Sequence, residues 1–143
     1  MSVAIRPPAG GEELRAALDL RFAVFCDEQG VPVELKLDEH DADALHLVAV
    51  EDGQVLSTCR LVRVGDTVKF GRLVVAPDAR RRGIAAAMLA EAERRARAMR
   101  AHRLVLSAQT YAMGLYEQAG YVAFGDTYDD AGIEHISMEL ALA

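Results

Sequence analysis

Hydrophobic and polar positions change their period several times along the chain. Residues 3–6 alternate and end at Pro7 and Pro8, a pattern that predicts a short β-strand. Residues 12–29 predict an amphipathic helix, because their apolar residues recur at helical spacing: Leu14, Leu18, Phe22 and Phe25. Residues 30–44 are acidic and have no clear period, so we expect a loop on the surface there.

Three strand-like runs come next, followed by alternating helical and strand patterns. Turn sequences with Asp-Gly and Gly-Asp separate the three runs, which favours an antiparallel meander. The predicted strands cover residues 45–50, 55–64, 68–75, 104–108, 121–124 and 133–140, and the predicted helices cover residues 83–101 and 111–118. The order βα-βββ-α-β-α-ββ predicts an α/β fold in which helices cover one mixed sheet.

The longest predicted helix has one apolar face and one charged face. Its charged face holds two pairs at favourable i,i+4 spacing, Glu91 with Arg95 and Glu93 with Arg97. Its apolar face consists of Ile84, Met88, Leu89, Ala92, Ala96 and Met99. We therefore expect this second face, with its two methionines, to pack in the core.

Composition and charge limit the class of protein. Of the 143 residues, 52% are hydrophobic, so residues 1–143 can form a single domain with a sizeable core. The net charge of −6 argues against a nucleic-acid or anionic-membrane binder. The chain has no signal-peptide pattern and no apolar run near the roughly 18 residues of a membrane span, so we expect a soluble, cytoplasmic protein. Cys26 and Cys59 lack metal or redox spacing, so we expect free thiols and no metal site.

Three arginines and a glycine stand before the alanine-rich start of the longest predicted helix, in the stretch VVAPDARRRGIAAAMLAEAERR. The first turn of a helix has unpaired backbone N–H groups and partial positive charge, which favour a bound anion. Gly83 lets a ligand approach the backbone, and the preceding arginines, Arg80, Arg81 and Arg82, can hold phosphate oxygens. The stretch therefore predicts a pyrophosphate site, with a solvated helix face as the alternative.

The segment from Arg80 to Ala85 resembles the acyl-CoA signature of the GNAT N-acetyltransferase family, Gln/Arg-x-x-Gly-x-Gly/Ala. Before it, FGRLVVAPDAR is similar to the family's fourth strand and following turn, and after it LVLSAQTYAMGLYEQAGYVAFG is similar to the family's next strand and helix. The resemblance covers essentially the whole chain. The stretches RFAVFCDEQGVPVELKLDEHDADALH and YDDAGIEHISMEL resemble a small bacterial subgroup typified by ElaA and YjcF.

This resemblance implies a splayed mixed sheet that holds acetyl-CoA as a co-substrate, and an amine acceptor that is a small molecule or a protein. Tyr116 matches the family tyrosine that protonates the departing thiolate, although a tyrosine of the core or of a pocket wall is the alternative. The backbone of Leu73, Val74 and Val75 would pair with the pantetheine arm. The pyrophosphate would contact Arg80, Arg81, Arg82, Gly83, Ile84, Ala85 and Ala86.

The general base is less clear, because the strand position that carries a glutamate in many relatives is Gly71 here. The remaining candidates are Glu28, His46, His135 and Asp38. For each histidine, a hydrogen-bonded structural role is the alternative. Beyond Glu28, we expect the substrate to be contacted by Gln29, His46, Gln109 and His135. A covalent acyl-enzyme on Cys26 is disfavoured, because no sequence neighbour marks an activated thiolate.

Two functions of different classes follow from these features. The first is a direct N-acetyltransferase that uses acetyl-CoA. The second is a non-catalytic acyl-CoA-binding module, suggested by the missing strand glutamate. Binding of nucleic acid by the arginine cluster is a weaker alternative that the net charge opposes. The sequence is compatible with a homodimer, and it identifies neither the acceptor nor the preferred acyl chain.

Overall fold

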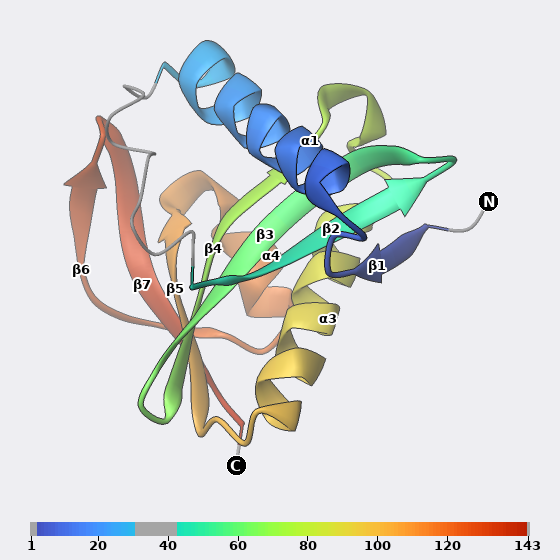
Figure 1. The fold of residues 1–143 in the computed structure, drawn as a ribbon. Coiled ribbons are helices and arrows are strands. Elements are labelled where there is room, and N and C mark those ends of the chain that lie inside the picture. The colour runs from blue at the N-terminus through green and yellow to red at the C-terminus, as the bar shows by residue number, and fades with distance from the viewer. Residues whose placement is uncertain (1–2, 31–42, 143) are drawn as a thin grey trace.

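The computed structural model describes residues 3–30 and 43–142, which form one seven-stranded sheet with helices on both faces (Figure 1). The strand order is β1-β2-β3-β4-β5-β7-β6. The elements along the chain are β1 (Ala4–Arg6), α1 (Gly11–Phe22), η1 (Ala23–Glu28), β2 (Leu45–Glu51), β3 (Gln54–Val64), β4 (Thr67–Val75), η3 (Pro77–Ala79), α3 (Ile84–Ala98), β5 (Arg103–Gln109), η4 (Thr110–Ala112), α4 (Met113–Gln118), β6 (Val122–Asp130) and β7 (Ile133–Ala141). The predicted α/β fold and its element order are confirmed.

Strand β2 is buried on both faces and separates two layers of core. Leu47 and Ala49 belong to the large cluster that includes Met88 of α3, whereas Val48 and Val50 pack with Ala17 of α1. Because successive side chains of a strand point to opposite faces, α1 and α3 cover opposite sides of the sheet. The first half of the molecule is therefore a three-layer sandwich.

The sheet opens between β4 and β5. These strands are parallel and pair only from Thr67 to Lys69, against Arg103 to Val105. Beyond this point β5 continues to pair with β7 as far as Gln109, while β4 continues along β3. The expected separation of the two strands is thus confirmed, and it leaves the facing edge of residues 70–75 without strand pairing to β5.

The first helix differs from the prediction of one continuous amphipathic helix. Regular α-helix ends at Phe22, and the next six residues wind as a π-helix, η1. The predicted apolar face is wrong at Leu18 and Phe22, which are 38% and 42% exposed. Buried Ala17 and Arg21 face the sheet instead, because a small Ala17 side chain allows close approach and Arg21 reaches His46 on β2.

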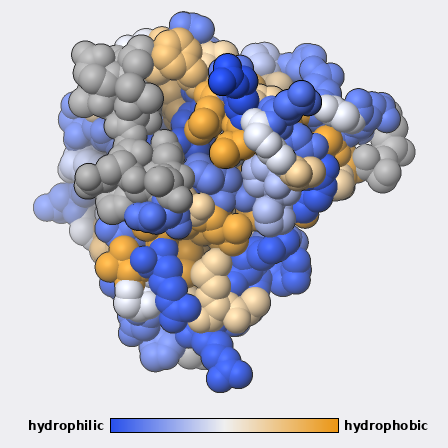
Figure 2. Space-filling view, viewed as in Figure 1, coloured by the Kyte–Doolittle hydropathy of each residue, from blue (hydrophilic) through white to orange (hydrophobic). Residues whose placement is uncertain are grey.

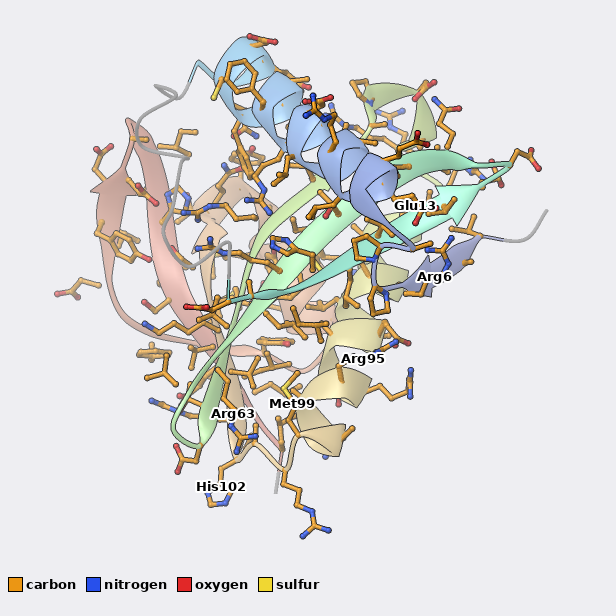
Figure 3. The ribbon with its side chains drawn as sticks, viewed as in Figure 1. Arg6, Glu13, Arg63, Arg95, Met99 and His102 are labelled. Atoms are coloured by element: carbon orange, nitrogen blue, oxygen red, sulfur yellow. The ribbon has the colours of Figure 1, made fainter. Side chains whose placement is uncertain are left out.

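Helix α3 follows its prediction more closely. Its predicted apolar face is buried, with Met99 at its end partly buried. Both predicted ion pairs form, with Arg95 Nε 2.7 Å from Glu91 Oε2 and Arg97 Nη2 2.9 Å from Glu93 Oε1. At the end of the helix, Arg63 of β3 donates a hydrogen bond of 2.7 Å to the carbonyl of Met99 (Figure 3).

Strand β6 is longer than predicted. Residues 125–130 were expected to connect two strands, but β6 pairs with β7 as far as Asp130, with an irregularity between Phe124 and Tyr128. Most of β6 is exposed, since it lies at the edge of the sheet and pairs with β7 alone. β6 can carry many polar residues because its exposed side chains remain in water at the edge of the sheet.

Candidate active site at the opening of the sheet

A cavity of about 900 Å³ occupies the place where β4 and β5 part. Its wall combines side chains from η1, β3, β4, β5, α4 and β7, which are distant in the sequence. Figure 2, viewed as in Figure 1, shows apolar and hydrophilic residues interspersed on this face of the molecule. The predicted site residues that line the cavity are Glu28, Gln29, Leu73, Val74, Val75, Arg80, Ala85, Gln109, Tyr116 and His135.

A β-bulge shapes the β4 wall of the cavity. Thr58 of β3 pairs with Val74, and Arg60 pairs with Gly71, so β4 has one more residue than β3 over this interval. The bulge contains Arg72 at a positive φ of 56°. A bulge bends its strand and redirects the following backbone. It therefore sets the orientation of the segment from Leu73 to Val75 at the open edge.

The turn into α3 lies beside this segment. Gly83 precedes the helix at a φ of 77°, where a side chain would cost free energy, and a Cβ placed there would meet no atom within 4 Å. The first N–H groups of any α-helix have no acceptor within the helix, and among the described residues no N-cap side chain supplies one to α3. This open turn with its N–H donors fits an anionic group such as a pyrophosphate.

The three arginines before Gly83 do not act as one cluster. Arg80 lines the cavity, donates to the carbonyl of Val75 at 3.1 Å, and makes two hydrogen bonds of 2.9 Å to the Glu28 carboxylate. Arg82 instead pairs with Glu51, at 3.2 and 2.8 Å. The side chains of Arg82 and of its neighbour Arg81 do not line the cavity.

The other residues predicted to contact the pyrophosphate differ in their surroundings. Ile84 is 5% exposed and packs in the core, so only its backbone is available to a ligand. Ala85 lines the cavity, whereas Ala86 does not. Small side chains at both alanines nevertheless leave the start of the helix accessible. The pyrophosphate contacts predicted from Ile84 and Ala86 would therefore have to come from their backbone N–H groups.

The carboxylate of Glu28 is held in an ion pair with Arg80. The hydrogen bonds from Arg80, followed by the nearby positive charge, lower the pKa of the Glu28 carboxyl below its ordinary value. Its carboxylate is therefore a weaker proton acceptor while the pair exists. This arrangement argues against Glu28 as the general base in the conformation described here.

Tyr116 lies on α4 at the wall of the cavity and is 9% exposed. Its ring meets Tyr121 edge to face, with the ring centroids 6.1 Å apart. Burial raises the pKa of Tyr116 to about 12, with smaller effects from Cys59 and Tyr111. The hydroxyl therefore keeps its proton at neutral pH and can serve as a proton donor.

Three predicted substrate-contact residues line the cavity around the end of β5. Gln109, at the end of β5, donates a hydrogen bond of 3.1 Å to the side-chain oxygen of Gln29 on the other side of the opening. The hydroxyl of Tyr111 donates to the side-chain oxygen of Gln109. His135 of β7 stands directly opposite Gln109 in the strand pairing. This polar group faces the same cavity as Tyr116.

Other predicted residues lie elsewhere. His46 is buried on β2, with its Nδ1 3.4 Å from Arg21, and it does not line the cavity. Asp38 lies outside the described residues. Cys26 is partly buried and also lies outside the cavity wall. Cys59 is fully buried, which raises the pKa of its thiol to about 12 and makes it unreactive.

Sequence reasoning missed several side chains of the open sheet face. Val105 and Ser107 of β5 line the cavity together with Gln109, while Lys69 lines it from β4. The signal that could have found them is the period of two within each strand, which places alternate residues on one face. The alternation of residues along a strand does not show which face of the sheet is open to the cavity.

A splayed mixed sheet with a glycine turn and helix start at its opening is the architecture of an acyl-CoA-dependent acyltransferase of the GNAT type. The family pattern described as "Acetyltransferase (GNAT) domain" matches residues 7–142, and the chain belongs to this family. In the residues that the structure describes, no helix is long and apolar enough to cross a membrane, and no group of three or more His, Cys, Asp or Glu side chains is placed to hold a metal ion.

Individual relatives agree with this assignment. Over 128 residues, the chain is 30% identical to the Bacillus subtilis (strain 168) protein named "Uncharacterized N-acetyltransferase YjcF", which covers 89% of this chain and 91% of the relative. An acyl-CoA N-acyltransferase from Pseudomonas aeruginosa superposes with a TM-score of 0.81 at 32% identity, covering 98% and 99% of the two chains. Escherichia coli ElaA shares the fold, with a TM-score of 0.84 at 22% identity and coverage of 96% and 97%. The predicted likeness to ElaA and YjcF is confirmed.

Proposed function

We propose that this chain is an acetyl-CoA-dependent N-acetyltransferase that transfers the acetyl group directly to a primary amine. The observation that carries this proposal is the position of Tyr116 in the same cavity as the unpaired edge of β4 and the start of α3. A site of this shape can hold a thioester beside a proton donor. Holding both reactants in one geometry removes much of the barrier to transfer.

The backbone offers most of the contacts for acetyl-CoA. Residues 73–75 have no partner from β5 and can pair with the amide groups of the pantetheine arm, while the N–H groups after Gly83 can receive the pyrophosphate. An N–H of β4 beside the thioester would stabilise the oxyanion that develops during attack. Arg80 supplies positive charge at the same end of the cavity.

The reaction joins the amine nitrogen to the thioester carbon and breaks the carbon–sulfur bond. Tyr116 Oη gives its proton to the departing thiolate, and a base removes one proton from the attacking amine. Because burial raises the pKa of Tyr116 to about 12, the phenol starts the reaction protonated. No covalent acyl-enzyme is needed, and Cys26 does not line the cavity.

A non-catalytic acyl-CoA-binding module is the alternative, and Gly71 is the observation that favours it. Gly71 lines the cavity and carries no carboxylate where many relatives have a glutamate. A side chain there would find open space, since its Cβ would meet no atom within 4 Å. Such a module would bind acetyl-CoA without turnover.

Isothermal titration of the protein with acetyl-CoA and CoA tests the proposal first. We expect micromolar affinity, lost in a Gly83→Glu variant whose side chain fills the open turn. Gly65→Glu is the matched control, because Gly65 also has a positive φ and open space but lies in the turn between β3 and β4. Equal loss of binding in both variants would indicate a general effect of the substitution.

An amine screen follows the titration. Polyamines, amino acids and short peptides with a free N-terminus would be offered together with acetyl-CoA, and released thiol would be measured. Turnover with at least one acceptor supports the enzyme. Binding of acetyl-CoA without turnover on any acceptor would favour the binding module, and failure to bind acetyl-CoA would overturn both.

A further inference from the structure

The imidazole of His135 is held in one tautomer. Its Nδ1 lies 2.7 Å from the backbone carbonyl of Ile133. Because a carbonyl oxygen only accepts hydrogen bonds, Nδ1 must carry the hydrogen of this contact. In the neutral ring the other nitrogen, Nε2, then has a free lone pair. The ring is thus prepared to accept a proton at Nε2.

Neighbouring strands fix the position of this ring. His135 is 8% exposed and stacks on Tyr128 of β6, with the ring centroids 6.1 Å apart and the planes 24° from parallel. The hydroxyl of Tyr128 is in turn hydrogen-bonded to Ser107 of β5. On its other side His135 stands opposite Gln109, which bridges to Gln29. The imidazole is therefore held by its stacking on Tyr128 and by the Ile133 carbonyl, and it borders the cavity that Tyr116 also lines.

We propose that His135 is the general base that takes the proton from the acceptor amine. This inference rests on the proposed acetyltransferase function and names a residue for its unassigned step. Tyr116 and His135 belong to α4 and β7, so proton donor and proton acceptor approach the cavity from separate elements. Tertiary packing, not sequence spacing, brings both residues to the wall of the same cavity.

Among the described residues, the other bases that the sequence analysis considered are less suited to the role. The Glu28 carboxylate accepts two hydrogen bonds from Arg80 and is held in an ion pair. His46 is buried on β2 away from the cavity wall. Gly71 has no side chain to accept a proton. His135 combines a position on the cavity with an Nε2 lone pair that the backbone contact of Nδ1 leaves available in the neutral ring.

The proton inventory of the step balances. Near neutral pH the acceptor starts as an ammonium, and Nε2 of His135 removes one proton to make the amine neutral. The amine nitrogen then bonds to the thioester carbon and its second proton passes to solvent, while the carbon–sulfur bond breaks as Tyr116 protonates the thiolate. His135 ends as an imidazolium and Tyr116 as a phenolate, and exchange of one proton between them through solvent restores both. Tyr128 of β6 stacks on the ring, and Glu134 is the preceding residue of β7. The cavity that the ring borders is also lined by these ionisable side chains: Glu28, Arg60, Lys69, Arg80, Arg103, Tyr111 and Asp130.

The decisive experiment is the pH dependence of kcat/KM for wild type and His135→Gln, with acetyl-CoA and the best acceptor of the amine panel. Near neutral pH, where an aliphatic amine is protonated, we expect the variant to lose about 10²- to 10³-fold in kcat/KM. The difference should shrink as the pH approaches the pKa of the amine, because a neutral amine needs less help from a base. His102→Gln is the matched control, since His102 is exposed beside Asp66 and does not line the cavity.

A second measurement does not depend on the acceptor. Long-range ¹H–¹⁵N spectra of the histidine rings should show His135 with its hydrogen on Nδ1 at neutral pH. A hydrogen on Nε2 would overturn the inference, and so would a loss of activity that is equal at every pH, which indicates a structural role. Full activity of His135→Gln beside an active wild type would also overturn it while leaving the acetyltransferase proposal intact. An inactive wild type would overturn both.

Discussion

Arg80 and Glu28 meet in two parallel hydrogen bonds of 2.9 Å, although 52 residues separate them in the sequence. The pair joins the turn before α3 to the end of η1, across the mouth of the cavity. A planar guanidinium binds a carboxylate and a phosphate group through the same donors. The carboxylate of Glu28 is therefore bound to the guanidinium of Arg80, which we propose contacts the pyrophosphate of acetyl-CoA.

Glu28→Gln should strengthen acetyl-CoA binding. Removal of the carboxylate charge releases Arg80 from a competing anion, and we expect the dissociation constant at pH 7 to fall about two- to fivefold. Since Arg80 lowers the pKa of Glu28, the competition in the wild type should persist until the pH falls below the ordinary range of a glutamate. Calorimetric titration measures both effects.

Glu51→Gln is the comparison for this prediction. It removes the partner of Arg82, whose side chain does not line the cavity, so a smaller change is expected. Weaker acetyl-CoA binding in Glu28→Gln would contradict the prediction and would mean that Glu28 orients Arg80 for the ligand.

Tyr116→Phe should lower kcat by about 10²- to 10³-fold and leave the dissociation constant of acetyl-CoA within about twofold. The substitution removes the proton donor but keeps the buried ring. Tyr121→Phe is the matched control, because its ring packs against Tyr116 while its buried hydroxyl finds no hydrogen-bond partner among the described residues. Steady-state kinetics and calorimetry separate the two effects. Equal kcat values for the two variants would show that the Tyr116 hydroxyl does not take part in the reaction.

Glu13→Gln should destabilise the fold at neutral pH and have no effect in strong acid. Arg6 of β1 makes hydrogen bonds of 2.7 and 3.1 Å to Glu13 of α1, and Ala9 N–H adds one of 2.8 Å (Figure 3). These contacts, led by Arg6, lower the pKa of Glu13 to about 2. The stabilisation is therefore fully present above about pH 4.5 and is lost as the pH falls through about 2.

Thermal unfolding of the two proteins between pH 7 and pH 2 tests this dependence. The melting temperature of Glu13→Gln should lie a few degrees below that of the wild type at pH 7, and the two curves should converge toward pH 2. Glu12→Gln serves as the control, since Glu12 lies in the same helical turn and makes no ion pair with another described residue. A constant offset at every pH would show that the ion pair is not the cause.

The two thiols should react very differently. Cys59 is fully buried and its pKa is raised to about 12, whereas Cys26 is partly exposed on η1. We expect a thiol reagent to modify Cys26 in the native protein and Cys59 only after unfolding in guanidinium. Cys26→Ala should keep acetyl transfer, because Cys26 does not line the cavity. A burst of enzyme-bound acetyl group that disappears in Cys26→Ala would contradict direct transfer.

The sequence by itself determined the order of helices and strands, the apolar face of α3 and the family. These features depend on periodicity and on residues close together along the chain. Gly83 and Arg80 belong to one local motif, and the pairs on α3 are four residues apart, so neither requires knowledge of distant contacts. One failed prediction was also local: Leu18 and Phe22 fit a helical period, but the sheet accepts the face that carries Ala17.

Only the tertiary structure decided how the candidate site is assembled. The pairing of Arg80 with Glu28 and the alignment of His135 with Gln109 depend on where β4 leaves β5 and on the register of β7. Strand register is fixed by the burial of whole sheet faces, because a shift of one residue would turn every side chain to the other face. Local sequence could name Glu28 and His135 as candidates, but their ion-pair partner and ring orientation come from segments distant in the chain.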